Sequence, residues 1–200
     1  MRKRQILAQQ ALLRHEKWLK GKVFNHIQFD DLETIEHSKM KPVTVTLFVS
    51  NERKILGFDV ARIRAKGHLA RLSEKKYGKR PNEAPGMRKK LFARMTEMIH
   101  PQALFESDEH PSYPDLIKKY FPNASHRTYQ SVRAAIAGQG ELKKIKYDPL
   151  FRINHTFAML RANVNRLIRR TWNTTKDIEA LKEHLTLYME FHNRVLTPPD

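Results

Sequence analysis

Residues 27–33 read Ile-Gln-Phe-Asp-Asp-Leu-Glu, an apolar, strand-like run that ends in acidic residues. A second run of this kind, residues 104–108, ends in Asp108. Carboxylates that share a divalent cation often come from distant parts of the chain, and strand ends are suitable places for them. Asp30 and Asp31 alternate across a strand, so only one of them can face a site that Asp108 shares. The two runs therefore predict a cation site with one aspartate from each.

Each of these aspartates also has a structural explanation. Asp30 and Asp31 could cap a turn before residues 32–34. Asp108 could be the N-cap of a helix that opens at Pro114, because Ser and Asp are common ahead of helices with proline in their first turn. The capping role of Asp108 is compatible with a ligand role.

The charge of the chain is strongly unbalanced. Its 200 residues include 38 Lys and Arg against 21 Asp and Glu, which gives a net charge of +17 and a pI near 10.2. Such an excess favours a polyanion as partner, and nucleic acid in particular. The alternative is a basic surface that binds nothing.

The sequence contains no cysteine. This excludes disulfides and zinc–thiolate sites and suits a reducing cytoplasm, where we expect the protein to act. The basic residues at the start are not followed by an apolar signal core. No apolar run approaches the roughly 20 residues of a membrane span, so we expect no membrane partner.

The hydrophobic pattern predicts an alternation of helices and strands. Gly21 ends a basic first helix at residues 1–20, and three strands with short connections then form an antiparallel meander. Asp177 is the expected cap of the last helix. The expected strands are residues 23–29, 41–49, 54–61, 103–106 and 128–132; the expected helices are residues 66–77, 87–99, 113–120, 150–170 and 178–195, with a link at residues 134–147.

This order predicts an α/β fold with a mixed sheet flanked by helices and a long helical region at its C-terminal end. It matches the ribonuclease H-like arrangement, in which the first strand carries one acid, the fourth strand a second and a late helix the third. We expect two parts, a basic helical arm at residues 1–21 and a ribonuclease H-like catalytic domain at residues 22–200.

Arginines recur along the helix expected at residues 150–170. They are Arg161, Arg166, Arg169 and Arg170, and Trp172 follows them. Arginine and aromatic side chains suit phosphate contact and base stacking. The alternative is a face exposed to water.

Ten histidines occur, but none forms a pair with the tight spacing of zinc ligands. His110 and His155 could contact the carboxylate site as a general base or a ligand. The alternative for each is a structural role.

Three segments, in order, resemble motifs of DDE transposases from bacterial insertion sequences. Residues 28–32 are similar to the segment around the first acid, residues 107–114 to the segment around the second, and residues 160–176 to the motif of the C-terminal helix. The matching residues in the last two are Ser107, Asp108, Tyr113 and Pro114, then Leu160, Arg161, Arg166, Leu167, Arg169, Arg170 and Lys176. The similarity covers nearly all of residues 23–195.

The resemblance implies a ribonuclease H-like catalytic core that cuts double-stranded DNA at element ends and joins them to a target. It implies Mg²⁺ or Mn²⁺ as cofactor, held by Asp30 and Asp108, and a homo-oligomer assembled on DNA. Water would attack first at the element end, and the freed 3′-hydroxyl would then attack target DNA. The arginines of the 150–170 helix and Lys176 would contact the DNA.

Two features depart from the family pattern. Where the family has a glutamate seven residues before the arginine matched to Arg161, this chain has Asn154. Asn154 is the expected third catalytic residue, but His155 or Asp148 could be the metal ligand in its place, or the site could lack activity. The family also carries an upstream DNA-binding module, for which residues 1–20 are too short, so we expect the catalytic part alone.

Two other functions fit the sequence. One is a DNA-binding relic of a transposase that has lost catalysis, which predicts salt-sensitive DNA binding without metal-dependent cleavage. The other is an RNA- or ribosome-binding protein in which the acids are caps, although no aromatic RNA-recognition signature is visible.

Overall fold

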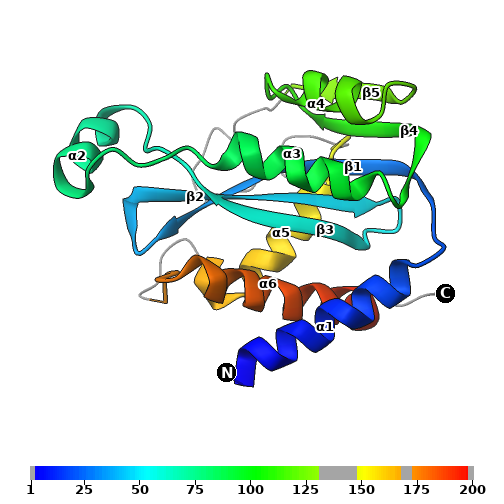
Figure 1. The fold of residues 1–200 in the computed structure, drawn as a ribbon, viewed down its shortest axis with the longest axis horizontal. Coiled ribbons are helices and arrows are strands. Elements are labelled where there is room, and N and C mark those ends of the chain that lie inside the picture. Colours follow the sequence, from blue (N-terminus) through cyan, green and yellow to red (C-terminus); the bar gives the residue numbers. More distant parts are fainter. Residues whose placement is uncertain (1–2, 131–147, 168–172, 198–200) are drawn as a thin grey trace.

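A five-stranded mixed sheet lies at the centre of the protein (Figure 1). The computed structural model describes residues 3–130, 148–167 and 173–197. The strands are β1 (Phe24–Glu36), β2 (Ser38–Ser50), β3 (Ile55–Arg62), β4 (Ile99–Asp108) and β5 (Ser125–Tyr129). They lie in the order β3-β2-β1-β4-β5; the β1–β2 and β2–β3 pairs are antiparallel, and the β1–β4 and β4–β5 pairs are parallel. The expected meander and the α/β class with a mixed sheet are confirmed.

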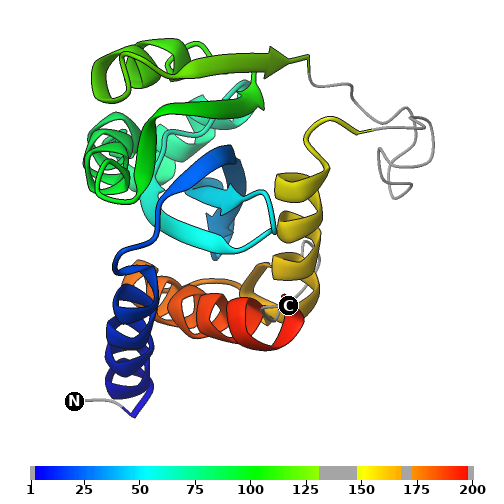
Figure 2. The ribbon, with the colours of Figure 1, turned by 90° about the vertical axis from the view of Figure 1, so that its right-hand side faces the viewer.

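Helices cover both faces of this sheet (Figures 1 and 2). They are α1 (Lys3–Leu19), α2 (His68–Tyr77), α3 (Ala84–Met95), α4 (Tyr113–Tyr120), α5 (Phe151–Asn163) and α6 (Ile178–Phe191), with a 3₁₀ turn η2 (Asn165–Leu167) and a π-helical turn η3 (His192–Leu196). The helix expected at residues 113–120 has those bounds. Asp177 caps α6 as expected, because its side chain accepts a hydrogen bond from Glu179 N. In the described ranges, no helix is long and apolar enough to cross a membrane.

Alternate residues of the strands build two apolar layers. On one face, aromatic side chains join the sheet to α3 and α4, and the rings of Phe29 and Phe48 stack with their centroids 5.1 Å apart. On the other face, Leu32 and aliphatic residues of β2 and β3 pack against α5 and α6. The alternation puts Asp31 on the side of α3 and Asp30 on the side of α5.

β1 is longer than the sequence predicted. The expected strand ended at residue 29, whereas β1 continues through the acidic run to residue 36. The run is accommodated because most of its carboxylates meet a cation. The pairs are Asp31–Arg88, Glu33–Lys66 and Glu36–Arg80. Asp30 therefore lies inside a strand, and the alternative explanation, a turn before residues 32–34, is wrong.

The helix expected at residues 87–99 is α3, which begins and ends earlier than predicted. Pro85 lies in its first turn, a position that suits proline. The helix cannot continue to residue 99, because Ile99 already pairs with Phe24 as the first residue of β4.

The helix expected at residues 150–170 is α5, which ends at Asn163. Val164 has an extended backbone, and both Val164 and Leu167 are buried in the apolar layer beside α6. This burial turns the chain away from the axis of α5. Residues 168–172 and the expected link at residues 134–147 lie outside the described residues.

The basic first helix, confirmed as α1, packs against α6 (Figure 1). Two ion pairs join these helices, Arg4–Glu183 and Arg14–Glu190. The buried ring of His15 lies with Nε2 3.0 Å from the carbonyl oxygen of Leu56 in β3. The division into an arm at residues 1–21 and a domain at residues 22–200 stays a prediction.

Gln28, whose side chain is buried, joins three elements. Its Nε2 donates to Glu106 Oε2 at 2.9 Å and to the Pro149 carbonyl oxygen at 2.7 Å, and its Oε1 accepts from Ile153 N at 3.1 Å. β1 is thereby linked to β4 and to the first turn of α5. The start of α5 consequently lies within two strand residues of Asp30, on the same face of the sheet.

Gln28→Leu should lower the free energy of unfolding by roughly 2–3 kcal/mol, because it leaves the Pro149 carbonyl and the Ile153 amide without a partner. Urea unfolding followed by circular dichroism measures the change. Gln102→Leu, at an exposed position of β4, is the matched control and should change stability by less than about 0.5 kcal/mol. Equal stability of Gln28→Leu and the wild type would contradict the bridging role.

Candidate carboxylate site

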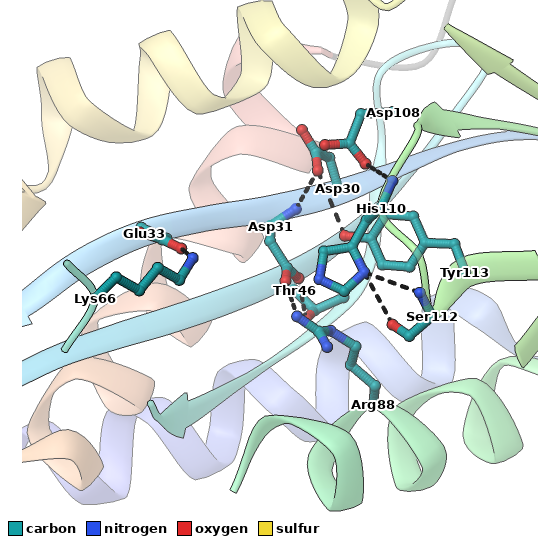
Figure 3. Close-up of polar contacts among 10 residues, drawn as sticks. All are labelled: Asp30, Asp31, Glu33, Thr46, Lys66, Arg88, Asp108, His110, Ser112 and Tyr113. Atoms are coloured by element: carbon teal, nitrogen blue, oxygen red, sulfur yellow. Dashed lines mark hydrogen bonds and ion pairs between the residues drawn. The ribbon is translucent and has the colours of Figure 1, made fainter. Parts of the chain in front are cut away.

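Two aspartates meet where β1 and β4 separate. The parallel pairing of these strands ends at Gln28 and Glu106, and Asp30 and Asp108 each lie two residues further along. Their carboxylates lie side by side (Figure 3), and the charge of Asp108 acts on Asp30. The structure therefore brings together the two aspartates on which the predicted site is based.

Asp30 keeps its proton to an unusually high pH. Burial and, next in size, the negative charge of Asp108 raise the pKa of Asp30 from 3.8 to about 8. Hydrogen bonds from Asp31 N, at 2.7 Å, and from the Tyr113 hydroxyl, at 3.4 Å, oppose this rise. Carboxylates placed so close together favour a shared proton or a cation between them. The pair therefore has the charge to accept a cation in place of the proton.

The turn after β4 orients Asp108. Its Oδ1 accepts a hydrogen bond from His110 N at 3.0 Å (Figure 3). The N-cap of α4 is Ser112, so Asp108 is not the helix cap that the sequence allowed. The other oxygen of Asp108 has no hydrogen bond to the described residues and is available to the site.

Asp31 faces the opposite side of the sheet and is occupied there. Arg88 of α3 and the Thr46 hydroxyl of β2 both donate to its carboxylate (Figure 3). The Arg88 side chain is 9% exposed and that of Asp31 is 12% exposed, so the two form a buried ion pair. Asp31 thus anchors α3, and Asp30 is the aspartate of this run that faces Asp108.

The ring of His110 lies on the side of Asp31 and Arg88 in a fixed orientation, while its backbone N contacts Asp108 (Figure 3). Its Nδ1 accepts a hydrogen bond from Ser112 N at 3.2 Å, and its ring stacks on Tyr113 with centroids 4.7 Å apart. Burial lowers the pKa of His110, and the charge of Arg88 lowers it further. Because Nδ1 accepts, the neutral ring carries its proton on Nε2.

The candidates for a third ligand lie at the start of α5. Asn154 Nδ2 donates to Asp148 Oδ2 at 2.9 Å. His155 Nδ1 lies 3.2 Å from Arg53 Nη1, in the turn between β2 and β3. Among the described residues, no three His, Asp or Glu side chains gather in a group that could hold a metal ion. The amide oxygen of Asn154 has no hydrogen bond to the described residues. Within the described ranges, no hydrogen bond or ion pair joins Asn154, His155 or Asp148 to Asp30 or Asp108.

The predicted DNA-binding residues do not lie on one helix. They include Arg161 on α5, Arg166 on η2 and Lys176 outside the helices. Arg161 is half-buried on α5, and Arg166 Nε donates to His184 Nδ1 at 3.0 Å. Lys176 is exposed just before α6. Arg169, Arg170 and Trp172 lie outside the described residues. A common binding face for these residues stays a prediction.

The sequence patterns did not point to the buried Glu106. Its carboxylate accepts hydrogen bonds from Gln28 Nε2 and the Tyr129 hydroxyl, both at 2.9 Å, and lies 2.7 Å from His26 Nε2. Burial alone would raise the pKa of Glu106, but these contacts lower it overall. Strand alternation was the available signal, since Glu106 is two residues before Asp108 and faces the same side.

Comparison of the chain with protein-family models gives no match, and comparison with curated proteins gives none either. The functional assignment therefore depends on the carboxylate pair, its surroundings and the charge of the chain.

Asp30→Asn should stabilise the protein, and by more as the pH rises. The pKa of Asp30 is about 8 in the folded chain against 3.8 without the fold. Between these values the folded form keeps a proton that the unfolded form loses, so wild-type stability falls with rising pH. We expect a gain of roughly 2–4 kcal/mol at pH 8 that shrinks to about zero at pH 3.5, measured by urea unfolding in EDTA.

The matched control is Glu97→Gln, which removes one negative charge from an exposed position. It should follow the wild-type stability across the same pH range. If Asp30→Asn also follows the wild type from pH 4 to pH 8, the raised pKa of Asp30 is contradicted.

Proposed function

We propose that this protein is the catalytic domain of a transposase, which cleaves and transfers DNA strands with the help of a divalent cation. The observation that carries the proposal is the pair of Asp30 and Asp108, whose carboxylates face each other from neighbouring parallel strands. A cation between them would relieve both their repulsion and the cost of burying charge. Carboxylates in this arrangement are the ligands of metal-dependent phosphoryl transfer.

The other acids of the two strands support this assignment. β1 and β4 contain six acidic residues. Four of these have ion pairs, Asp31, Glu33, Glu36 and Glu106. Asp30 and Asp108 have none with the described residues, although they are the two that lie side by side. A positive partner from outside the chain is the simplest way to balance them.

The order of the elements supports a ribonuclease H-like core. Such a core carries its acids on the first strand, on the fourth strand and on a late helix. Asp30 lies on β1 and Asp108 on β4. The late helix α5 begins beside β1, where Gln28 holds its first turn.

The net charge supports DNA as the substrate. Two carboxylates repel a phosphodiester unless positive charge elsewhere compensates them. The chain has a net charge of +17. Contacts from Lys and Arg to phosphates supply most of the affinity of proteins for DNA, so this excess suits a duplex as partner.

The two carboxylates of the site suit a hard cation, but no third carboxylate of the described residues joins them. Asp30 and Asp108 offer carboxylates, which Mg²⁺ and Mn²⁺ prefer, and Asn154 of α5 would be the proposed third ligand through its amide oxygen. When bound, the ion supplies positive charge that stabilises the attacking and leaving oxygens of a phosphodiester. His110, with its proton on Nε2, has a donor for a phosphate oxygen, and its contacts with Ser112 and Tyr113 fix the direction of that donor.

A second candidate function is a DNA-binding relic of such an enzyme. The observation that favours it is that, in the described part of the chain, no third His, Asp or Glu joins Asp30 and Asp108. An amide such as that of Asn154 binds a hard cation less well than a carboxylate does. The relic and the enzyme differ in one measurable property, metal-dependent cleavage.

A plasmid that carries the DNA flanking the coding sequence tests the proposal. We expect nicking that needs Mg²⁺ or Mn²⁺ and stops with EDTA. Asp108→Asn should slow it by at least roughly 100-fold, the upper end of what loss of an outer-shell partner costs. Asparagine keeps the acceptor for His110 N and removes the charge, so the variant isolates the ligand role.

The matched control is Glu109→Gln, at the exposed neighbouring position, which should nick at the wild-type rate. Undiminished nicking by Asp108→Asn would contradict the proposed enzyme. DNA binding without nicking by the wild type would favour the relic.

A further inference from the structure

A basic lobe projects from one end of the sheet. It consists of residues 64–80, here called the α2 lobe, and it lies beside the far end of the β1–β2 hairpin (Figure 1). Ser73 Oγ donates to the Met40 carbonyl oxygen at 2.6 Å and so attaches α2 to β2. Ser73 is the buried residue of α2, while Leu72 is 52% exposed. Burial of apolar side chains therefore does not account for the position of α2 against the sheet.

Charge is the dominant property of the α2 lobe. Residues 64–80 contain seven Lys and Arg and one acidic residue, Glu74. Such a concentration of one sign creates a local positive potential that attracts anions. The lobe is thus a basic surface separate from the predicted arginines of α5.

A small pocket lies within this lobe. Its volume is about 110 Å³, and the residues that line it include Arg64, Ser73, Glu74, Gly78, Lys79 and Arg80. Gly78 has a φ of 73°, in the left-handed region that favours glycine. The chain turns there, and after the turn Lys79 and Arg80 line the pocket together with Arg64.

Arg80 is held rigidly in that wall. Its side chain is 10% exposed, and its Nη2 donates to Glu36 Oε2 at 3.1 Å. Its Nε is buried and has no hydrogen-bond partner among the described residues. Arg64 Nε donates to the Arg80 carbonyl oxygen at 3.0 Å, which fixes the two arginines relative to each other. Two oriented guanidinium groups therefore line the pocket, together with the exposed ammonium group of Lys79.

We propose that this pocket binds a phosphate of the DNA backbone. Guanidinium groups match the oxygens of a phosphate, and an ammonium group such as that of Lys79 adds a point charge. Glu74 is the opposing charge in the lining. The proposal rests on the proposed function only in taking duplex DNA as the partner.

The position of the pocket suits a duplex that also reaches the aspartates. Arg80 bonds Glu36, which is six residues beyond Asp30 on β1. Six strand residues span about 20 Å. This span is shorter than one turn of duplex DNA, which is about 34 Å long. A duplex of 20 base pairs is therefore long enough to extend from the pocket to the carboxylate pair.

The test is DNA binding in EDTA, measured by fluorescence anisotropy with a labelled 20-base-pair duplex over a series of salt concentrations. The double variant Arg64→Gln, Lys79→Gln removes two exposed charges of the pocket. It should lower the salt slope, log Kd against log salt, by between about one and two. Glu74→Gln removes the opposing charge and should tighten binding.

The matched control is the double variant Lys118→Gln, Lys119→Gln, which removes two exposed charges from α4 on another part of the molecule. We expect it to change the slope by clearly less. Equal slopes for the wild type and the pocket variant, or equal losses for the pocket and control variants, would overturn the proposal. A duplex RNA of the same length, if bound more tightly than DNA with the same loss in the pocket variant, would overturn the choice of DNA.

This experiment needs neither metal nor cleavage. If the pocket variant binds DNA as tightly as the wild type, the phosphate pocket is contradicted but the proposed cation site at Asp30 and Asp108 is not. If the wild type fails to nick the plasmid, the proposed enzyme is contradicted but the result of the salt-slope experiment is not affected. The two proposals can therefore fail separately.

Discussion

The parallel pairing of β1 with β4 is the constraint on which the site depends. Pairing of Gln28 with Glu106 sets the register, and this register puts Asp30 opposite Asp108 two residues later. A slip of one residue would turn the side chains of one strand to the other face and separate the carboxylates. Gln28 adds the start of α5 to the same arrangement through Ile153 N. Burial and repulsion within the pair then raise the pKa of Asp30 to about 8.

Other acidic residues of β1 and β4 have structural roles, and their carboxylates have partners in the chain. Asp31 is neutralised by Arg88 and a hydroxyl, and Glu106 is surrounded by donors that keep it ionised. Asp30 and Asp108 receive one backbone hydrogen bond each but no cation from the described residues. Within the same two strands, the acids with structural roles thus have cations or several donors around them, and the candidate site residues do not. This difference becomes visible only in the structure, where the contacts of each side chain can be compared.

The sequence predicted much of the scaffold and part of the site. Strand alternation predicted the meander, and the proline-opened segment predicted α4 with its observed bounds. The end of β1 was predicted too early, because the cations that stabilise its acids, such as Arg88, are distant in sequence. The end of α5 was predicted too late, since burial of Val164 is a tertiary effect. The pocket around Arg80 depends on contacts across the fold, which no local pattern encodes, whereas strand alternation could have pointed to Glu106.

The most direct test of a cation site at the paired aspartates is a calorimetric titration of Mn²⁺ into the protein at pH 7, repeated in two buffers with different heats of protonation. Asp30, with a pKa of about 8, is protonated at that pH before the ion enters. We expect the wild type to release about one proton for each ion bound, because a ligand must be deprotonated to bind a metal. Asp30→Asn should bind Mn²⁺ much more weakly and release no proton. Equal affinity of the wild type and Asp30→Asn for Mn²⁺, or binding without proton release by the wild type, would contradict a cation site formed by Asp30 and Asp108.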